Sequence, residues 1–221
     1  MRDWQQWHRS YEDPSSSLSR RLAVVRRHVS DVLDASRGYP LRVLSLCAGD
    51  GRDLLPVLAK RAPPIEFAVL VERDPVIAET ARRTGAERRI EGLSVITGDA
   101  GDPEQFAEAY PVDLLLLCGI FGNVSEQDIK TTVSATPGLL RDDGTVIWTR
   151  GSTEPALRPS IRHLFDEAGL QEMAFDSEPK GFGVGVAIKP TGVDAGATQP
   201  AQHRAALSQE REVAHVVAFV A

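Results

Sequence analysis

The sequence predicts an α/β fold, a doubly wound and mainly parallel seven-stranded sheet with helices on both faces and an N-terminal helical lid. Apolar segments of strand length alternate along the chain with segments whose apolar residues recur at helical spacing. The unbroken apolar run at 112–117 is typical of a strand buried on both faces, as parallel sheets require. Both observations favour one layered sheet over an all-helical or all-β domain.

A long helix is expected first, over about 18–35, because apolar residues between Leu22 and Leu33 recur at helical spacing. Gly38 and Pro40 end it. Charged residues off its apolar stripe are expected to face solvent. These are Arg20, Arg21, Arg26 and Arg27.

The alternation of strands and helices begins after this helix. Strands are expected at about 42–46, 66–71, 93–97, 112–117 and 145–149. Helices are expected at about 52–61, 74–84, 104–109, 125–134 and 155–168, the second of them begun by Asp74 and Pro75. Segments 171–175 and 183–189 are expected to form a last antiparallel pair at the sheet edge. Near the C-terminus, 201–211 fits a helix, and the apolar segment 213–220 fits an extra strand or an interface.

Composition limits the function classes that remain open. A chain of 221 residues can bury a sizeable core, and its formal net charge of −6 disfavours duplex nucleic acid as a partner. No apolar run is long enough to cross a membrane, and the first residues lack the apolar centre of a secretory signal. Cys47 and Cys118 are interpreted as reduced thiols of a cytoplasmic protein. No metal site is expected, because no His or Cys pair has ligand spacing.

The most informative motif lies between the first two expected strands. Cys47-Ala48-Gly49-Asp50-Gly51 joins a strand to a helix, and the next strand ends in Glu72. Glycines let the backbone approach a ligand closely, and an acid at that strand end accepts hydrogen bonds from ribose hydroxyls. The sequence therefore predicts a nucleoside-binding βαβ unit.

From Leu41 to Lys189 the order of motifs resembles class I S-adenosylmethionine-dependent methyltransferases. The resemblance rests on the glycine-rich segment 43–51, on Glu72, on Gly98-Asp99-Ala100, on the strand and turn at 113–119, and on the glycine turn before the fifth strand. It implies a methyltransferase that uses S-adenosylmethionine. The residues it assigns to the cofactor are Ser45, Cys47, Ala48, Gly49, Asp53, Glu72, Arg73, Asp99, Ala100, Cys118 and Gly119.

Two residues depart from the family pattern, which has an acid where Ser45 stands and a glycine where Cys47 stands. Asp50 and Asp53 lie close by, and either is able to supply the missing negative charge. For Asp53 the alternative is a solvated residue at a helix start, favoured by the helix dipole. A nicotinamide enzyme is disfavoured, because these acids crowd a helix N-terminus that a pyrophosphate needs free. The third glycine of the dinucleotide pattern is also missing.

The acceptor and the catalytic groups are less clearly marked. Segment 118–125 is expected to line the reaction centre, and it lacks the Asn/Asp-Pro-Pro-aromatic signature of many amino-group methyltransferases. With the acidic charge, this favours a small-molecule acceptor and is compatible with specialised metabolism. In the N-terminal segment, His8 and Tyr11 are candidate catalytic bases, and packing of this segment on the domain is the alternative. Arg150, after the fifth strand, is a candidate partner of an acceptor carboxylate.

The predicted organisation has three parts. Residues 1–40 form an N-terminal helical segment or lid, 41–190 a Rossmann-like adenosylmethionine-binding domain, and 191–221 a C-terminal extension whose apolar end is compatible with a homodimer. Two other functions stay open. One is an RNA or protein methyltransferase, and the other is a non-catalytic or non-methylating adenosylmethionine-binding protein.

Overall fold

A seven-stranded sheet forms the centre of the computed structural model, which describes residues 11, 13–61, 63–152 and 156–192. The strand order is β3-β2-β1-β4-β5-β7-β6. Pairing is parallel from β3 to β5 and antiparallel between β5 and β7 and between β7 and β6. The strands are β1 (Leu41–Leu46), β2 (Ile65–Glu72), β3 (Leu93–Thr97), β4 (Val112–Leu117), β5 (Leu140–Gly151), β6 (Gln171–Ser177) and β7 (Phe182–Ile188). This confirms the predicted fold class.

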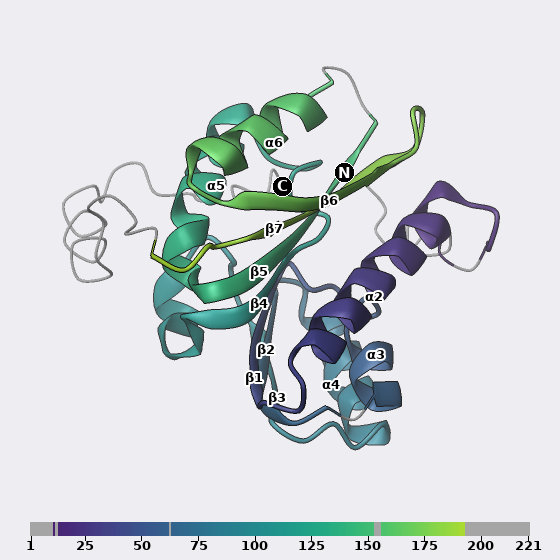
Figure 1. Cartoon of the computed structure of the whole chain (residues 1–221). Coiled ribbons are helices and arrows are strands. Elements are labelled where there is room, and N and C mark those ends of the chain that lie inside the picture. The colour runs from purple at the N-terminus through teal and green to yellow at the C-terminus, as the bar shows by residue number, and fades with distance from the viewer. Residues whose placement is uncertain (1–10, 12, 62, 153–155, 193–221) are drawn as a thin grey trace.

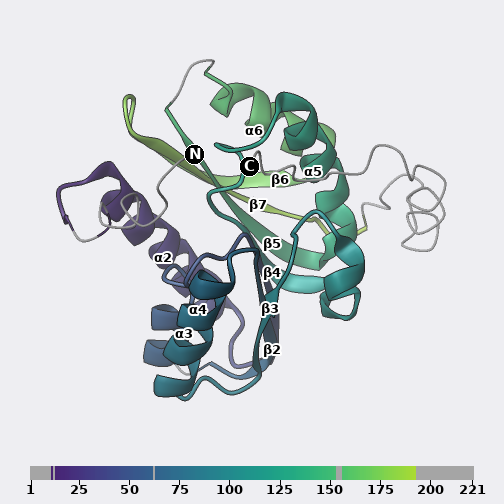
Figure 2. The same ribbon diagram turned by 180° about the vertical axis from the view of Figure 1, so that it is seen from behind.

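Helices cover both faces of the sheet (Figures 1 and 2). The face covered by α2, α3 and α4 and the face covered by η1, α5 and α6 each hold a separate apolar cluster. Leucines of β4 alternate between the two clusters, which explains its unbroken apolar sequence. The helices are α2 (Ser17–Ala35), α3 (Leu55–Arg61), α4 (Pro75–Glu87), the 3₁₀ helix η1 (Pro103–Ala109), α5 (Glu126–Leu139) and α6 (Arg158–Glu167). None of these helices is long and apolar enough to cross a membrane.

Several predicted boundaries were wrong, each for a local reason. Helix α3 begins at Leu55 rather than near 52, because residues 51–54 form turns. Helix α5 continues through Pro137, where an interruption was expected, and runs directly into β5. Helix α6 starts at Arg158, where Pro159 fits the first turn. The helix and strand expected within 201–220 lie outside the described residues.

Arg20 and Arg27 of α2 are exposed as expected, but Arg21 and Arg26 are half-buried, so the prediction was wrong for those two. Arg26 donates from Nε and Nη2 to the carbonyl of Arg52, at 2.8 and 2.6 Å. Arg21 and Arg20 are bound by Tyr11 and Glu178, respectively. The polar side of α2 therefore fastens this helix to the loop that follows β1 and to the far strands of the sheet. Arg27 adds another contact, because its Nη2 donates a hydrogen bond to Asp176 Oδ2 at 2.7 Å.

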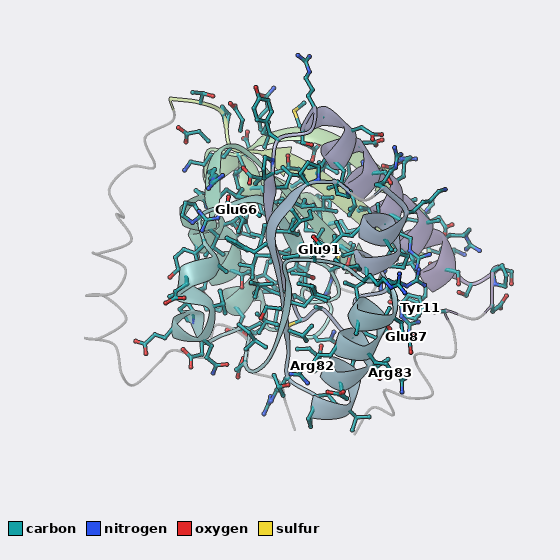
Figure 3. The ribbon with its side chains drawn as sticks, turned by 90° about the horizontal axis from the view of Figure 1, so that it is seen from below. Tyr11, Glu66, Arg82, Arg83, Glu87 and Glu91 are labelled. Atoms are coloured by element: carbon teal, nitrogen blue, oxygen red, sulfur yellow. The ribbon has the colours of Figure 1, made fainter. Side chains whose placement is uncertain are left out.

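The parallel strands β1 to β5 all end at the same edge of the sheet. Figure 3 looks at the opposite edge, where Glu66 lies near the start of β2 and Glu91 precedes β3. Chain order reverses between β1 and β4, and ligands of open α/β sheets bind beyond the carboxyl ends at such a point. The candidate site is built there.

Candidate functional site

A shallow pocket lies beyond the carboxyl ends of β1, β2 and β3 and opens to solvent. The pairing of Glu72 with Thr97 sets the ends of β2 and β3 level, so that Glu72 and Asp99 reach the same hollow. The pocket contains five residues that the resemblance assigns to the cofactor. Its lining is Cys47, Val71, Glu72, Arg73, Gly98, Asp99 and Ala100.

Glu72 connects the glycine-rich loop to the second strand. Its Oε2 accepts a hydrogen bond from the Gly49 backbone N–H at 2.8 Å, and its Oε1 accepts one from the Asp74 N–H at 2.9 Å. Each carboxylate oxygen keeps a second lone pair, so that it is able to accept a hydrogen bond from a ligand hydroxyl. This is the geometry that binding of two ribose hydroxyls requires.

The two glycines of the loop have different roles. Gly49 adopts φ +58°, and among the described residues no atom beyond its chain neighbours lies within 4 Å of the place where a Cβ would stand, so its surface is open to a ligand. Gly51 adopts φ +72°, and a Cβ there would lie 2.6 Å from Leu55 Cδ1. Gly49 thus leaves room for a ligand, whereas Gly51 allows the loop to pack on the core.

Asp99 lines the pocket from the loop that follows β3. Its Oδ1 accepts a hydrogen bond from the Gly101 N–H at 2.8 Å, which fixes the carboxylate in the loop after β3. No described residue bonds to its Oδ2, so this oxygen remains available to a ligand donor such as an amino group.

Cys47 retains the backbone shape of the glycine that it replaces. Its φ of +53° lies in the left-handed region, which is uncommon for residues other than glycine. Burial raises the pKa of its thiol, and the negative charges of Glu72 and Asp99 raise it further. The thiol is therefore protonated at neutral pH and adds no charge to the pocket.

A second group of polar atoms lies on the α2 side of the same strand ends. The carboxyl of Asp53 is 8% exposed, and its Oδ1 has no hydrogen-bond partner in the described structure. The Oγ of Ser45, 1% exposed, also has none. Burial raises the pKa of Asp53 to about 6, and Asp50 raises it as well, whereas Arg21 lowers it. The interpretation of Asp53 as a solvated helix residue was therefore wrong.

Asp50 is the less suitable of the two acids that the sequence left open. Arg52 binds both of its oxygens, at 2.8 Å from Nε to Oδ1 and 2.5 Å from Nη2 to Oδ2.

Cys118, which directly follows β4, has a raised pKa because of its burial and, to a smaller extent, because of the Asp53 charge. The buried carboxyl next to the expected reaction centre is thus that of Asp53, whose Oδ1 has no described partner although the group also interacts with the N–H groups of Asp53 and Leu54 and with the Cys118 thiol.

Tyr11 is placed beside this carboxyl, and His8 lies outside the described residues. Arg21 Nη2 donates to the Tyr11 hydroxyl at 2.6 Å, and the guanidinium of Arg52 lies over the Tyr11 ring at 4.3 Å. Burial is the main cause of a raised pKa for Tyr11. The charge of Arg21 lowers this pKa, and the charge of Asp53 raises it. A neutral phenol is a poor base at neutral pH, so the catalytic roles of both residues stay predictions.

The loop after β4 is held against the end of β5. The Gly119 N–H donates to Thr149 Oγ1 at 2.9 Å, and Asn123 Nδ2 donates to the Gly119 carbonyl at 2.7 Å. Arg150 Nη1 donates to the Phe121 carbonyl. Asn123 lies in the segment 118–125 that the sequence analysis singled out, whereas Thr149 was missed, because no distinctive spacing marks it.

No family model matches this sequence, and no curated protein matches it by sequence. Solved structures do match its fold. The magnesium protoporphyrin IX methyltransferase ChlM from Synechocystis PCC 6803, solved with bound SAM, is 13% identical with a TM-score of 0.64, over 84% of this chain and 90% of that one. The N-methyltransferase NodS from Bradyrhizobium japonicum WM9 is 17% identical with a TM-score of 0.57, over 81% and 99%.

An O-methyltransferase family protein from Burkholderia thailandensis is 16% identical with a TM-score of 0.60. The match covers 77% of this chain but only 57% of that longer protein. At these identities the similarities establish the fold and not the activity. The chain has the fold of class I S-adenosylmethionine-dependent methyltransferases, as the order of its motifs predicts.

Proposed function

We propose that this protein binds S-adenosylmethionine beyond the carboxyl ends of β1 to β4 and transfers its methyl group to a small organic acceptor. The observation that carries the proposal is that Glu72 and Asp99 line the same pocket. The backbone of Gly49, which is bound by Glu72, is open to a ligand beside them. The shared fold supports it. Acidic net charge favours a small acceptor over RNA.

The pocket fits the adenosine part of this cofactor. Glu72 has free lone pairs for the two ribose hydroxyls, and the free Oδ2 of Asp99 is suited to the adenine amino group. Cys47 and Ala100 provide apolar lining, and Cys47 remains uncharged. Both carboxylates are already fixed by backbone N–H groups, so little conformational freedom is lost on binding.

The α2 side fits the amino-acid part. Asp53 Oδ1 and Ser45 Oγ are buried acceptors without partners, and buried polar atoms normally have one. An ammonium group satisfies both, and it also neutralises the Asp53 charge. Asp53 therefore replaces the acid that the family carries at the position of Ser45.

Methyl transfer asks the protein mainly for position. The bound cofactor supplies an electrophilic sulfonium methyl group, and the chain must hold the acceptor atom in line with it and exclude water. The loop at 118–123, fixed by Thr149 and Asn123, forms one wall of that space. Tyr11 and α2 close the opposite side. His8 stays the predicted base for an acceptor that carries a proton.

Calorimetry with S-adenosylmethionine and S-adenosylhomocysteine tests the proposal. We expect both to bind, and we expect Glu72→Gln and Asp99→Asn each to weaken binding by about 10-fold or more, as for charge-assisted hydrogen bonds. Asp166→Asn, on the exposed side of α6, is the matched control and should bind normally. No binding by the wild type, or full affinity in both pocket variants, would reject the proposal.

An acceptor screen with purified protein then separates the alternatives. Methylation of RNA or of a peptide in preference to small molecules would favour the macromolecular methyltransferase. Binding without turnover on any acceptor would favour the non-methylating protein. The cytoplasmic location, the homodimer and the three-part domain division stay predictions.

A further inference from the structure

Arg150 is a buried cation that forms no ion pair with any of the described residues. It is the last residue but one of β5, and it is 7% exposed. Its Nε has no hydrogen-bond partner within the described structure, and its Nη1 donates only to the carbonyl of Phe121. Glu126, exposed in the first turn of α5, acts on it through space but forms no ion pair with it.

An arrangement of this kind is costly without an anion. A guanidinium is charged at every accessible pH, and burying a charge without a partner is strongly unfavourable. One neutral carbonyl and one exposed carboxylate satisfy only part of its five donors. The remaining donors are therefore suited to an oxyanion that is not part of the protein.

The position of Arg150 connects it to the proposed reaction centre. Side chains alternate along a strand, so Thr149 faces Gly119 on the α2 side, while Arg150 shares a face with Trp148 on the α5 and α6 side. Phe121, its hydrogen-bond partner, is two residues beyond Gly119 in the loop that follows β4. Arg150 is thus joined through Phe121 to the loop that is expected to line the reaction centre, on the side of this loop away from α2.

Gly122 is the residue next to the guanidinium of Arg150 at the surface. Gly122 is exposed, and a Cβ built on it would stand 4.0 Å from Arg150 Nη1, which is ordinary contact. Its φ is not in the left-handed region, so nothing in its backbone requires glycine there. Only backbone, with no side chain, therefore separates this part of the guanidinium from solvent at Gly122.

We propose that Arg150 binds a carboxylate of the methyl acceptor, which makes the acceptor a small carboxylic acid. This inference rests on the proposed function, because it concerns the acceptor of that reaction. A guanidinium fork matches a carboxylate in geometry. A singly charged group fits better than a phosphate dianion, because Glu126 is near and no second cation of the described residues faces Arg150.

Fluorine NMR with paired probes tests this inference. The probes are 4-fluorobenzoate with 4-fluorobenzamide, and 4,4,4-trifluorobutanoate with its amide, titrated into the full chain with S-adenosylhomocysteine. We expect at least one acid to bind more tightly than its amide. Arg150→Gln should weaken acid binding by about 10- to 100-fold and leave amide binding unchanged. A residue that only supported the loop would change both probes together.

Further variants keep the test decisive if Arg150→Gln folds poorly. Arg150→Lys keeps the charge and a donor for Phe121, so it should retain a preference for the acid, reduced because the fork is lost. Gly122→Val should block both members of a pair without backbone strain. Arg162→Gln removes an arginine already paired with Glu172 at 2.6 Å and should leave all probes unaffected.

Two results would overturn the inference. One is equal binding of acids and amides by the wild type, and the other is tighter Arg150-dependent binding of inorganic phosphate than of either acid. All titrations are repeated without S-adenosylhomocysteine, and its own binding is measured by calorimetry in the same samples. Failure of the cofactor to bind would then reject the proposed function, while the preference for acids over amides is decided separately.

Discussion

The substitution Asp53→Asn should have opposite effects on folding and on cofactor binding. Asp53 is 8% exposed, its Oδ1 has no partner in the described structure, and its pKa is raised from 3.8 to about 6. The folded protein therefore holds a proton on this group more tightly than the unfolded chain does. Ionisation of Asp53 costs no stability below about pH 3.8, and the cost grows until the pH has passed about 6.

The magnitude follows from the shift. About two pKa units at 1.36 kcal/mol each give a cost of about 3 kcal/mol for the ionised carboxylate above pH 6. The asparagine variant avoids this cost, so the apoprotein should be up to about 3 kcal/mol more stable at pH 7.5. For a chain of this size that corresponds to about 6–12 °C in Tm. At pH 4 the two proteins should melt together.

Binding should change in the opposite direction. Loss of one charge-assisted contact should weaken S-adenosylhomocysteine binding by about 10- to 100-fold at pH 7.5. Because only the ionised carboxylate attracts the ligand ammonium, wild-type affinity should fall about 10-fold per pH unit below pH 6. The affinity of the variant should not show this fall.

Thermal melts and calorimetry at pH 4, 6 and 7.5 measure both effects. Asp50→Asn is the informative neighbour, because Arg52 already binds that carboxylate and because its charge raises the pKa of Asp53. It should move the midpoint of the pH dependence downward and leave the affinity at pH 7.5 near that of the wild type. An Asp53→Asn protein that is less stable at pH 7.5, or that binds S-adenosylhomocysteine normally, would refute the reasoning.

Two further predictions concern the loop and the α2 attachment. Gly49→Ala should cost only the left-handed strain, about 1–2 kcal/mol, while Gly51→Ala adds overpacking against Leu55 and Leu70, for about 2–4 kcal/mol in urea denaturation. Equal costs would show that the loop is not packed as described. Burial raises the pKa of Asp176, but hydrogen bonds from Arg27 and His28 outweigh it and hold that pKa below its usual value. Asp176→Asn should therefore lose about 1 kcal/mol at pH 7 after allowance for solvent screening, and the difference should shrink as the pH falls below 3.8 and through the lower pKa of the folded state. A difference that stays constant down to the lowest pH at which both proteins are folded would exclude the ion pair as its source.

The sequence predicted those features that depend on local pattern. β3 and β4 match their predicted ranges because each is an apolar run bounded by turn-forming residues. Glu72 and Asp99 were identified from their position after strands, and parallel pairing then necessarily brings them to one edge. For these residues, periodicity and order along the chain contain the information.

What the sequence could not predict depends on contacts between distant segments. The choice between Asp50 and Asp53 is decided by Arg52, whose carbonyl is in turn bound by Arg26 of α2. The arginines of α2 look like a solvated face because their partners, such as Asp176 and Glu178, lie near the other end of the chain. Arg150 was noticed in the sequence, but its burial without an ion-pair partner among the described residues is visible only in the fold.

These contacts join the N-terminal helix to the proposed cofactor site. Arg21 lowers the pKa of Asp53 and binds Tyr11, while Arg26 holds the loop that carries Asp53. A carboxylate at the position of Ser45 on β1 would have its ionisation set by the neighbouring strands. With the charge on Asp53, the ionisation of this carboxyl depends on Arg21 of α2, so we expect the position of α2 and the affinity for the ligand ammonium to be coupled through one titrating group.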